Sequence, residues 1–200
     1  MTLASDGSIT AELRERSTGQ AAVDERRLYA GSSPGDYLKA IETWVARGAL
    51  GAEVSQVTPT DEPAAGRFAL DVRFTAAHYA KPVQQLLVFK PKLLSRQESA
   101  FPTDQTRHYP IVLEAQSFGE TARFRLPEDF AVDELPAPVA IEESFGTFAA
   151  ACAVENGVLR FTRRMSLKSS TIPVADYARV REFFLKVRAA DQSSVVLAKK

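Results

Sequence analysis

The side chains of this sequence that could support nucleophilic catalysis are one cysteine, Cys152, and two histidines, His78 and His108. A thiol that passes its proton to a neighbouring histidine is the nucleophile of cysteine hydrolases. Such a cysteine usually lies at the N-terminus of a helix or beside a cation, where its pKa is lowered. Cys152 instead falls in a stretch that alternates like a strand, on the same face as Phe148 and Val154. This pattern favours a small buried hydrophobic residue over a catalytic thiol.

The histidines, cysteine and acidic residues lack the sequence spacing that is typical of metal sites and of acid–base pairs. His78 and His108 lie far apart in the sequence, without the His-x-x-x-His or Cys-x-x-Cys spacing of common metal sites. Glu142 and Glu143 are adjacent acids in a predicted strand, where neighbours point to opposite faces, so they cannot act as one acid–base pair. The glycines are scattered and predict no phosphate-binding loop. We therefore expect no metal, no cofactor and no catalytic activity.

A group of cations along one predicted strand is the main candidate for a binding surface. The group comprises Arg160, Arg163, Arg164 and Lys168, with Arg123 and Arg125 on a strand that could be its neighbour. Such a surface could bind an anion or an acidic partner. The alternative, which we favour at this point, is a charged outer face that discourages pairing at the edge of a sheet.

Arg163 departs from the alternation of its strand. Leu159, Phe161 and Met165 share one face, whereas Arg160 and its polar neighbours share the other. Arg163 interrupts the apolar face. We therefore expect Arg163 to lie near an edge or an end of the sheet.

Two tyrosines, Tyr79 and Tyr109, complete the candidate binding surface. Together with Phe89 and Phe101 they could form an exposed aromatic cluster. Such a cluster would favour a module that binds a cell-envelope glycan or a protein, since loops at the ends of a sandwich often carry binding sites. Burial of these rings would count against that function.

The elements that must position these residues include two main helices. Residues 34–47 are expected to form one, because Ser33 can cap it, Pro34 suits its first position and Gly48 suits its end. Pro173 opens the second, which has an apolar stripe at helical spacing.

The remaining pattern is mostly that of strands. Residues 68–74 alternate clearly, and Asn156-Gly157 is a strong hairpin signal that joins strands 147–154 and 159–168. Residues 20–29 are expected to be a further helix. The sequence thus predicts an α+β fold with a predominantly antiparallel, sandwich-like sheet system and two main helices packed on it.

The chain is expected to contain two regions within one compact unit. Residues 1–126 form a β-rich region with helix 34–47, and residues 139–200 form a region of hairpin, helix and strand. Prolines and acidic residues in 127–138 indicate a loop that joins them.

Net charge, the length of apolar runs and the cysteine count limit which partners and covalent links the chain is expected to have. The 25 basic and 25 acidic residues cancel, which disfavours nucleic acid and anionic membranes, because both attract a surface of one positive sign. No apolar run approaches the roughly 20 residues of a membrane-spanning helix. With a single cysteine, an internal disulfide is excluded, and a chain of this length needs none to be stable.

Three stretches resemble a large bacterial family. They are Leu126 to Pro136, Ser144 to Phe148, and Ile172-Pro173 followed by Tyr177 and Phe183-Phe184. The family consists of transglutaminase-like proteins that carry an N-terminal domain of unknown function, a cysteine hydrolase core and a C-terminal β-rich region. This chain is similar to the region that follows the core.

The resemblance implies a non-catalytic accessory domain. The family's Cys-His-Asp triad belongs to the core, whose motif is absent here, so no catalytic role passes to Cys152. The expected partner is that core on the same polypeptide, and the expected location is the periplasm or the cell surface. A β-sandwich module that binds a glycan or a protein is the alternative, and an independent cysteine hydrolase is a remote third.

Overall fold

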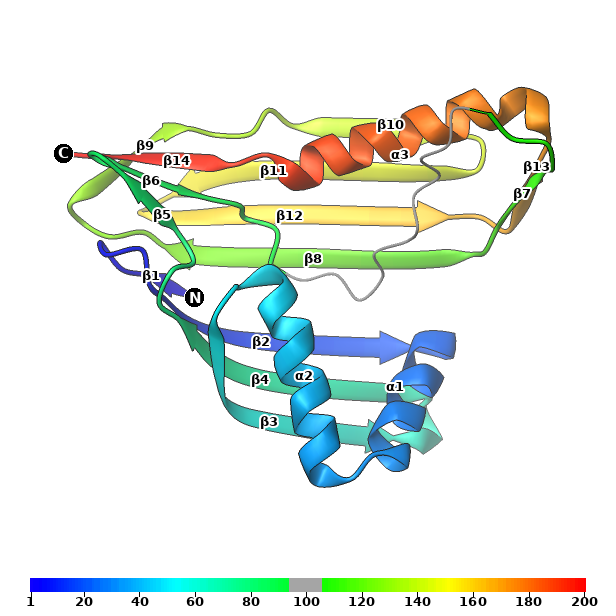
Figure 1. The fold of residues 1–200 in the computed structure, drawn as a ribbon, viewed down its shortest axis with the longest axis horizontal. Coiled ribbons are helices and arrows are strands. Elements are labelled where there is room, and N and C mark those ends of the chain that lie inside the picture. Colours follow the sequence, from blue (N-terminus) through cyan, green and yellow to red (C-terminus); the bar gives the residue numbers. More distant parts are fainter. Residues whose placement is uncertain (94–105) are drawn as a thin grey trace. The chain divides into compact units, whose positions relative to one another are not determined.

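The structure, a computed structural model, describes residues 1–93 and 106–200 (Figure 1). The chain divides into two compact units, Met1–Pro82 and Val83–Lys200. Each unit combines antiparallel strands with α-helix, so the predicted α+β class with mainly antiparallel sheets is confirmed.

The first unit is a four-stranded antiparallel sheet with two helices. Its strands are β1 (Thr2–Leu3), β2 (Ile9–Thr18), β3 (Ala52–Glu62) and β4 (Arg67–Ala76). They lie in the order β1-β2-β4-β3. The helices α1 (Gly19–Gly31) and α2 (Pro34–Gly48) contact this sheet, and the 3-10 helix Pro63–Ala65 leads from β3 to β4.

Helix α2 begins where its cap predicts. The Ser33 hydroxyl accepts a hydrogen bond of 3.2 Å from the backbone N–H of Asp36, which satisfies one of the free donors of the first turn. The apolar stripe of this helix faces the core, as its spacing predicts, through Tyr37, Ile41, Trp44 and Val45. Besides the two main helices, the described residues form a further α-helix, α1, which includes residues 20–29, where the sequence predicts a helix.

The second unit contains two larger sheets, a short strand pair and one α-helix. Its first sheet holds β8 (Gln116–Arg125), β10 (Val139–Glu143), β11 (Gly146–Glu155) and β12 (Val158–Leu167). Its second sheet holds β6 (Leu86–Phe89), β9 (Phe130–Glu134) and β14 (Val195–Lys199), and β5 (Lys81–Val83) lies at the boundary with the first unit. The pair is β7 (Ile111–Leu113) with β13 (Ser170–Ile172), and the 3-10 helix Val174–Asp176 precedes α3 (Tyr177–Gln192).

The hairpin of β11 and β12 forms at the predicted turn. Asn156 and Gly157 both have positive φ, 50° and 71°, and the register closes on Glu155 opposite Val158. The strand order β10-β11-β12-β8 therefore leaves β12 paired along both of its sides.

Helix α3 covers one face of this sheet and runs beside β10 and β11 (Figure 1). Phe183 lies 5.4 Å from the ring of Phe145, which precedes β11. The buried stripe of the helix consists of Tyr177, Val180, Phe183, Phe184 and Val187. The predicted apolar stripe of this helix is confirmed.

Residues 127–138 lie inside the second unit, whereas the units divide between Pro82 and Val83. This segment turns at Pro127, whose carbonyl accepts from the Phe130 N–H, and then supplies β9. Because β9 pairs with β14 and the next strand β10 pairs with β11, the segment carries the chain from one sheet to the other.

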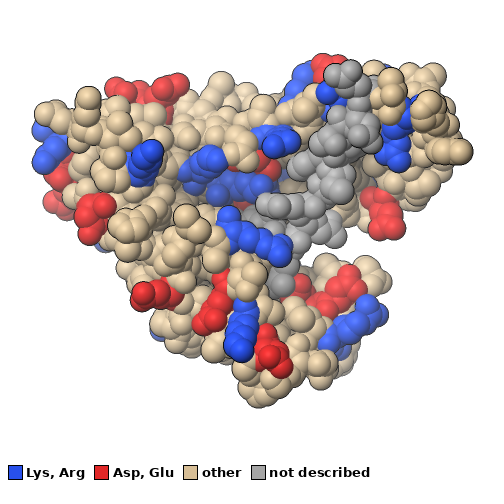
Figure 2. Space-filling view, viewed as in Figure 1, with Lys and Arg blue, Asp and Glu red and all other residues tan. Residues whose placement is uncertain are grey.

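The surface of the described residues has mixed charge. Basic and acidic side chains occur side by side on the face drawn in Figure 2. Of the helices in the described parts of the chain, none has both the length and the apolar character needed to cross a membrane.

Candidate functional site

Strand β12 carries arginines on both of its faces, exposed on one and buried on the other. Arg160 and Arg164 are exposed on one face, whereas Arg163 is 2% exposed on the other, among Leu159 and Met165. The prediction that Arg163 lies near an edge or an end of the sheet is wrong. Its strand is paired on both sides, and the strict alternation of a strand carries its side chain into the core.

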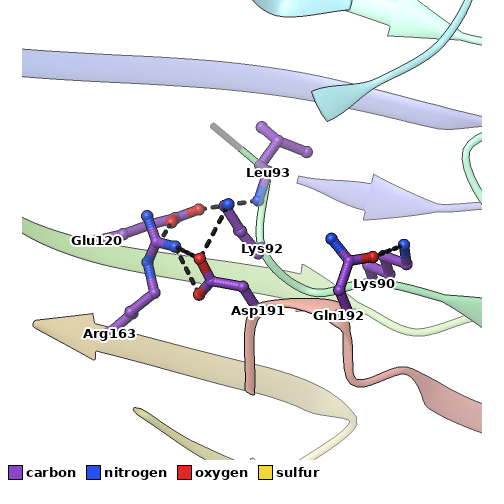
Figure 3. Close-up of polar contacts among 7 residues, drawn as sticks. All are labelled: Lys90, Lys92, Leu93, Glu120, Arg163, Asp191 and Gln192. Carbon is purple, nitrogen blue, oxygen red and sulfur yellow. Dashed lines mark hydrogen bonds and ion pairs between the residues drawn. The ribbon is translucent and has the colours of Figure 1, made fainter. Parts of the chain in front are cut away.

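Arg163 forms ion pairs there with two carboxylates, and a second cation pairs with one of them (Figure 3). We call these four residues the Arg163 cluster: Lys92, Glu120, Arg163 and Asp191. Nη1 of Arg163 donates to both carboxylate oxygens of Asp191 at 2.6 Å. Lys92 Nζ lies 3.0 Å from Asp191 Oδ2, and Nε of Arg163 lies 3.5 Å from Glu120 Oε2.

Four segments of the second unit supply the cluster. Glu120 on β8 is directly opposite Arg163 in the register, Asp191 is in the last turn of α3, and Lys92 follows β6. The backbone N–H of Leu93 donates to Glu120 Oε1 at 2.9 Å. The cluster therefore fastens the end of α3 and the chain after β6 to the middle of the sheet.

Two further contacts support the cluster. The ring centroid of Phe118, next to Glu120 on the inner face of β8, lies 4.7 Å from the guanidinium carbon of Arg163, a distance at which a cation is attracted to the ring. Lys90 also donates a hydrogen bond to the side chain of Gln192, which ends α3. Both contacts hold the same elements together.

The chemistry available to the Arg163 cluster is limited by its own pairing. Two cations and two carboxylates give it no net charge, and each carboxylate faces a cation. Charges removed from water are tolerated when they are paired in this way, and loss of one partner leaves the other buried and uncompensated. The arrangement joins β8, β12, the end of α3 and the chain after β6.

Sequence patterns contained a signal for this cluster. The stripe of α3 at Val180, Phe184 and Val187 continues at the same spacing to Asp191, so the helix places an acid on its buried face. Arg163 is a base on the apolar face of a strand. Two opposite charges on the apolar faces of two elements are a signal for a buried ion pair, which Arg163 considered without Asp191 does not give.

The remaining predicted cations form a second feature, the arginine face, defined by Arg123, Arg125, Arg160 and Arg164. All four are exposed. Arg160 lies directly opposite Arg123 in the register of β12 and β8, and Arg164 lies opposite Gly119. The predicted neighbour relation between the two strands is therefore correct.

Lys168 lies just outside the end of β12 and is exposed. Its backbone N–H donates to the carbonyl of Phe145 at 2.9 Å, which closes the turn before β11 against the end of β12. Because Lys168 follows the last residue of β12 that pairs with β8, it is not counted in the arginine face.

Cys152 is half-buried in β11, opposite Phe161. Burial raises the pKa of its thiol, which disfavours the nucleophilic thiolate. It lines a hollow of about 10 Å³ together with Pro91, Pro136 and Ala190, among others, which is too small for a substrate.

The two histidines are exposed and belong to different units, His78 to the first and His108 to the second. Within the parts of the chain that the structure describes, no group of His, Cys, Asp and Glu side chains could hold a metal ion.

The predicted aromatic cluster does not include Phe89. This ring is 3% exposed and packs on Phe124 with the ring centroids 5.2 Å apart. Tyr109 is 78% exposed in the second unit, and Tyr79 is partly buried in the first. Phe101 lies outside the described residues.

An open surface hollow of about 590 Å³ lies beside β9 in the second unit. Its lining is mainly apolar, with Leu126, Phe130 and Val154. Among its polar lining residues, Lys200 donates from Nζ to the backbone carbonyl of Glu128 at 2.6 Å. Among the described residues, its lining has no group of converging polar side chains of the kind that orients a substrate.

Comparison with known proteins gives one match. Residues 84–197 match the model of the family DUF3858, described as a domain of unknown function with a solved structure. This span covers more than half of the 200 residues and includes both the Arg163 cluster and the arginine face. No curated protein and no solved structure gives a significant match to the chain.

Proposed function

We propose that this chain, which belongs to the DUF3858 family, is a non-catalytic accessory domain of a bacterial protein with a transglutaminase-like core. The domain supports that core or positions its substrate, and the core carries the catalytic residues. The periplasm or the cell surface is the proposed location.

The observation that carries this proposal is that the charged side chains of the Arg163 cluster form ion pairs with one another. The carboxylate of Asp191 forms ion pairs with both Arg163 and Lys92. An enzyme site instead leaves an acid, a base or a nucleophile directed at a space that a substrate can enter. Cys152 supports the same conclusion, because burial raises the pKa of its thiol.

The link to a transglutaminase-like core is supported by the sequence resemblance, whose residues form the fold. Leu126 to Pro136 contains the turn and strand β9, and Phe145 and Phe148 are buried. Gly146 lies so close to β12 that an added Cβ would be 2.8 Å from the carbonyl oxygen of Ser166. Residues of this kind preserve an architecture, and function is argued separately from it.

One observation counts against the glycan-binding alternative. Phe89, one of the four rings whose exposure would favour it, is packed in the core against Phe124, whereas Tyr109 is exposed. Binding of a protein does not depend on that ring.

The test uses the natural polypeptide that contains this chain, with and without residues 1–200. Both forms are assayed for hydrolysis of amide bonds in a denatured protein substrate, and their thermal unfolding is followed. We expect a Cys-His-Asp core in the polypeptide, and lower turnover or a lower Tm of that core when the domain is removed. A polypeptide without such a core, or a core unchanged in both quantities, would contradict the proposal.

A further inference from the structure

We propose that the arginine face of the second unit, defined by Arg123, Arg125, Arg160 and Arg164, is a docking surface for a protein segment rich in aspartate and glutamate. This inference goes beyond the accessory role, and it holds whether or not a transglutaminase-like core belongs to the same polypeptide.

The spacing of the cations fits a row of carboxylates. Arg160 and Arg123 are direct cross-strand partners on β12 and β8, and Arg125 is two residues along from Arg123 on the same face. Arg164 is four residues from Arg160, a separation of about 13 Å along a strand. An extended acidic segment laid on the sheet would meet successive guanidinium groups.

Three of these guanidinium groups are available for a partner. Within the described residues, Arg125, Arg160 and Arg164 make no ion pair. Direct opposition of like charges, as for Arg160 and Arg123, destabilises a sheet by itself. An acidic partner would relieve this repulsion.

Edge protection does not explain the arginines of β12. Charges that discourage strand pairing belong on edge strands, and lysine is the residue usually found there. Strand β12 is paired with β11 along one side and with β8 along the other. All four cations of the face are arginine, which is enriched in protein interfaces, whereas lysine is depleted.

The surroundings of the arginines are small and flat. The exposed positions between and beside them are Ser117, Gly119, Thr121, Ala149, Ala151 and Ala153. A carboxylate can therefore approach a guanidinium group without a bulky neighbour, and the planar fork of arginine binds it through two parallel hydrogen bonds.

The same surroundings disfavour nucleic acid and membrane as the occupant. Bases need exposed aromatic rings for stacking, and the alternating positions of this face hold none. A membrane surface needs apolar side chains that enter the lipid, and alanine is too small for this.

The probe is a fluorescent poly-L-glutamate peptide, whose binding to the 200-residue chain is measured by anisotropy at physiological ionic strength. Arg160→Glu and Arg164→Glu should each weaken binding by about tenfold or more, because each replaces a charge-assisted hydrogen bond by repulsion. Arg188→Glu on α3, which is also exposed, makes the same change of charge away from the face and should weaken binding less than twofold.

Three results would overturn the inference. The first is no measurable binding of poly-L-glutamate by the unaltered chain. The second is an equal loss of affinity for Arg188→Glu and Arg160→Glu, which would indicate non-specific attraction. The third is tighter binding of single-stranded DNA or of vesicles of anionic phospholipid than of poly-L-glutamate, which would assign the face to another class of partner.

Discussion

Arg163 in the middle of β12 and Asp191 in the last turn of α3 are joined by two hydrogen bonds of 2.6 Å, one to each carboxylate oxygen. Both residues are almost completely buried, at 2% and 8% exposure. A helix end is thereby tied to an interior strand by charge as well as by apolar packing. This relationship leads to the first two predictions.

Arg163→Met should lower the free energy of unfolding by about 3–5 kcal/mol, because the buried Asp191 and the partly buried Glu120 would keep Lys92 as their remaining cation. Urea unfolding followed by circular dichroism measures the loss. The matched control is Arg160→Met on the exposed face of the same strand, which should change stability by no more than about 0.5 kcal/mol. Similar losses for the two variants would contradict a stabilising role of the pair.

Arg163→Met combined with Asp191→Leu should destabilise the protein less than the sum of the two single changes. When Arg163 and Asp191 are both replaced, neither charge of the pair is left buried without its partner. Glu120 and Lys92 remain and have opposite charges. We expect a coupling energy of about 1–3 kcal/mol from the double-mutant cycle. Additive losses would mean that the two side chains act independently.

Gly146→Ala should be destabilising, because its new Cβ would lie 2.6 Å from Leu167 Cδ2 and 2.8 Å from the backbone oxygen of Ser166. Such a clash costs about 1–3 kcal/mol. Gly119→Ala is the control in a neighbouring part of the same sheet, where the nearest atom is Arg164 Cγ at an ordinary 3.7 Å. Thermal unfolding should show a clear drop in Tm for Gly146→Ala alone.

Sequence patterns predicted the elements whose signals are local. Ser33 and Pro34 specify where α2 begins, and Asn156-Gly157 specifies the hairpin, because a cap or a turn depends on a few adjacent residues. Alternation placed Arg160 and Arg164 on the exposed face of β12.

The Arg163 cluster required information that local patterns lack. Arg163 and Asp191 are 28 residues apart, and their contact depends on how α3 packs on the sheet. Phe89 shows the same limit. Its strand is visible as an apolar run, but whether a ring at its end is covered depends on Phe124 from another strand.

The thiol of Cys152 should react slowly with a maleimide at neutral pH and quickly once the chain is unfolded. Burial raises its pKa, so the folded state holds the proton more firmly than the unfolded chain does. The resulting stabilisation is fully present below the thiol's ordinary pKa and is lost as the pH rises through the raised value.

Comparison with Cys152→Ala isolates this contribution. The difference in unfolding free energy between the two proteins should be constant around neutral pH and shift against the unaltered protein in alkaline solution. Rapid labelling of the folded protein at neutral pH would instead indicate an exposed, activated thiolate.

The most direct test of the proposed non-catalytic role is an assay of the purified 200-residue chain for hydrolysis of peptide and amide substrates, beside Cys152→Ala. We expect no turnover above the uncatalysed rate for either protein, since burial raises the pKa of the Cys152 thiol and the buried Arg163 and Asp191 are paired with each other. Turnover by the unaltered chain that is lost in Cys152→Ala would instead make this chain a cysteine hydrolase.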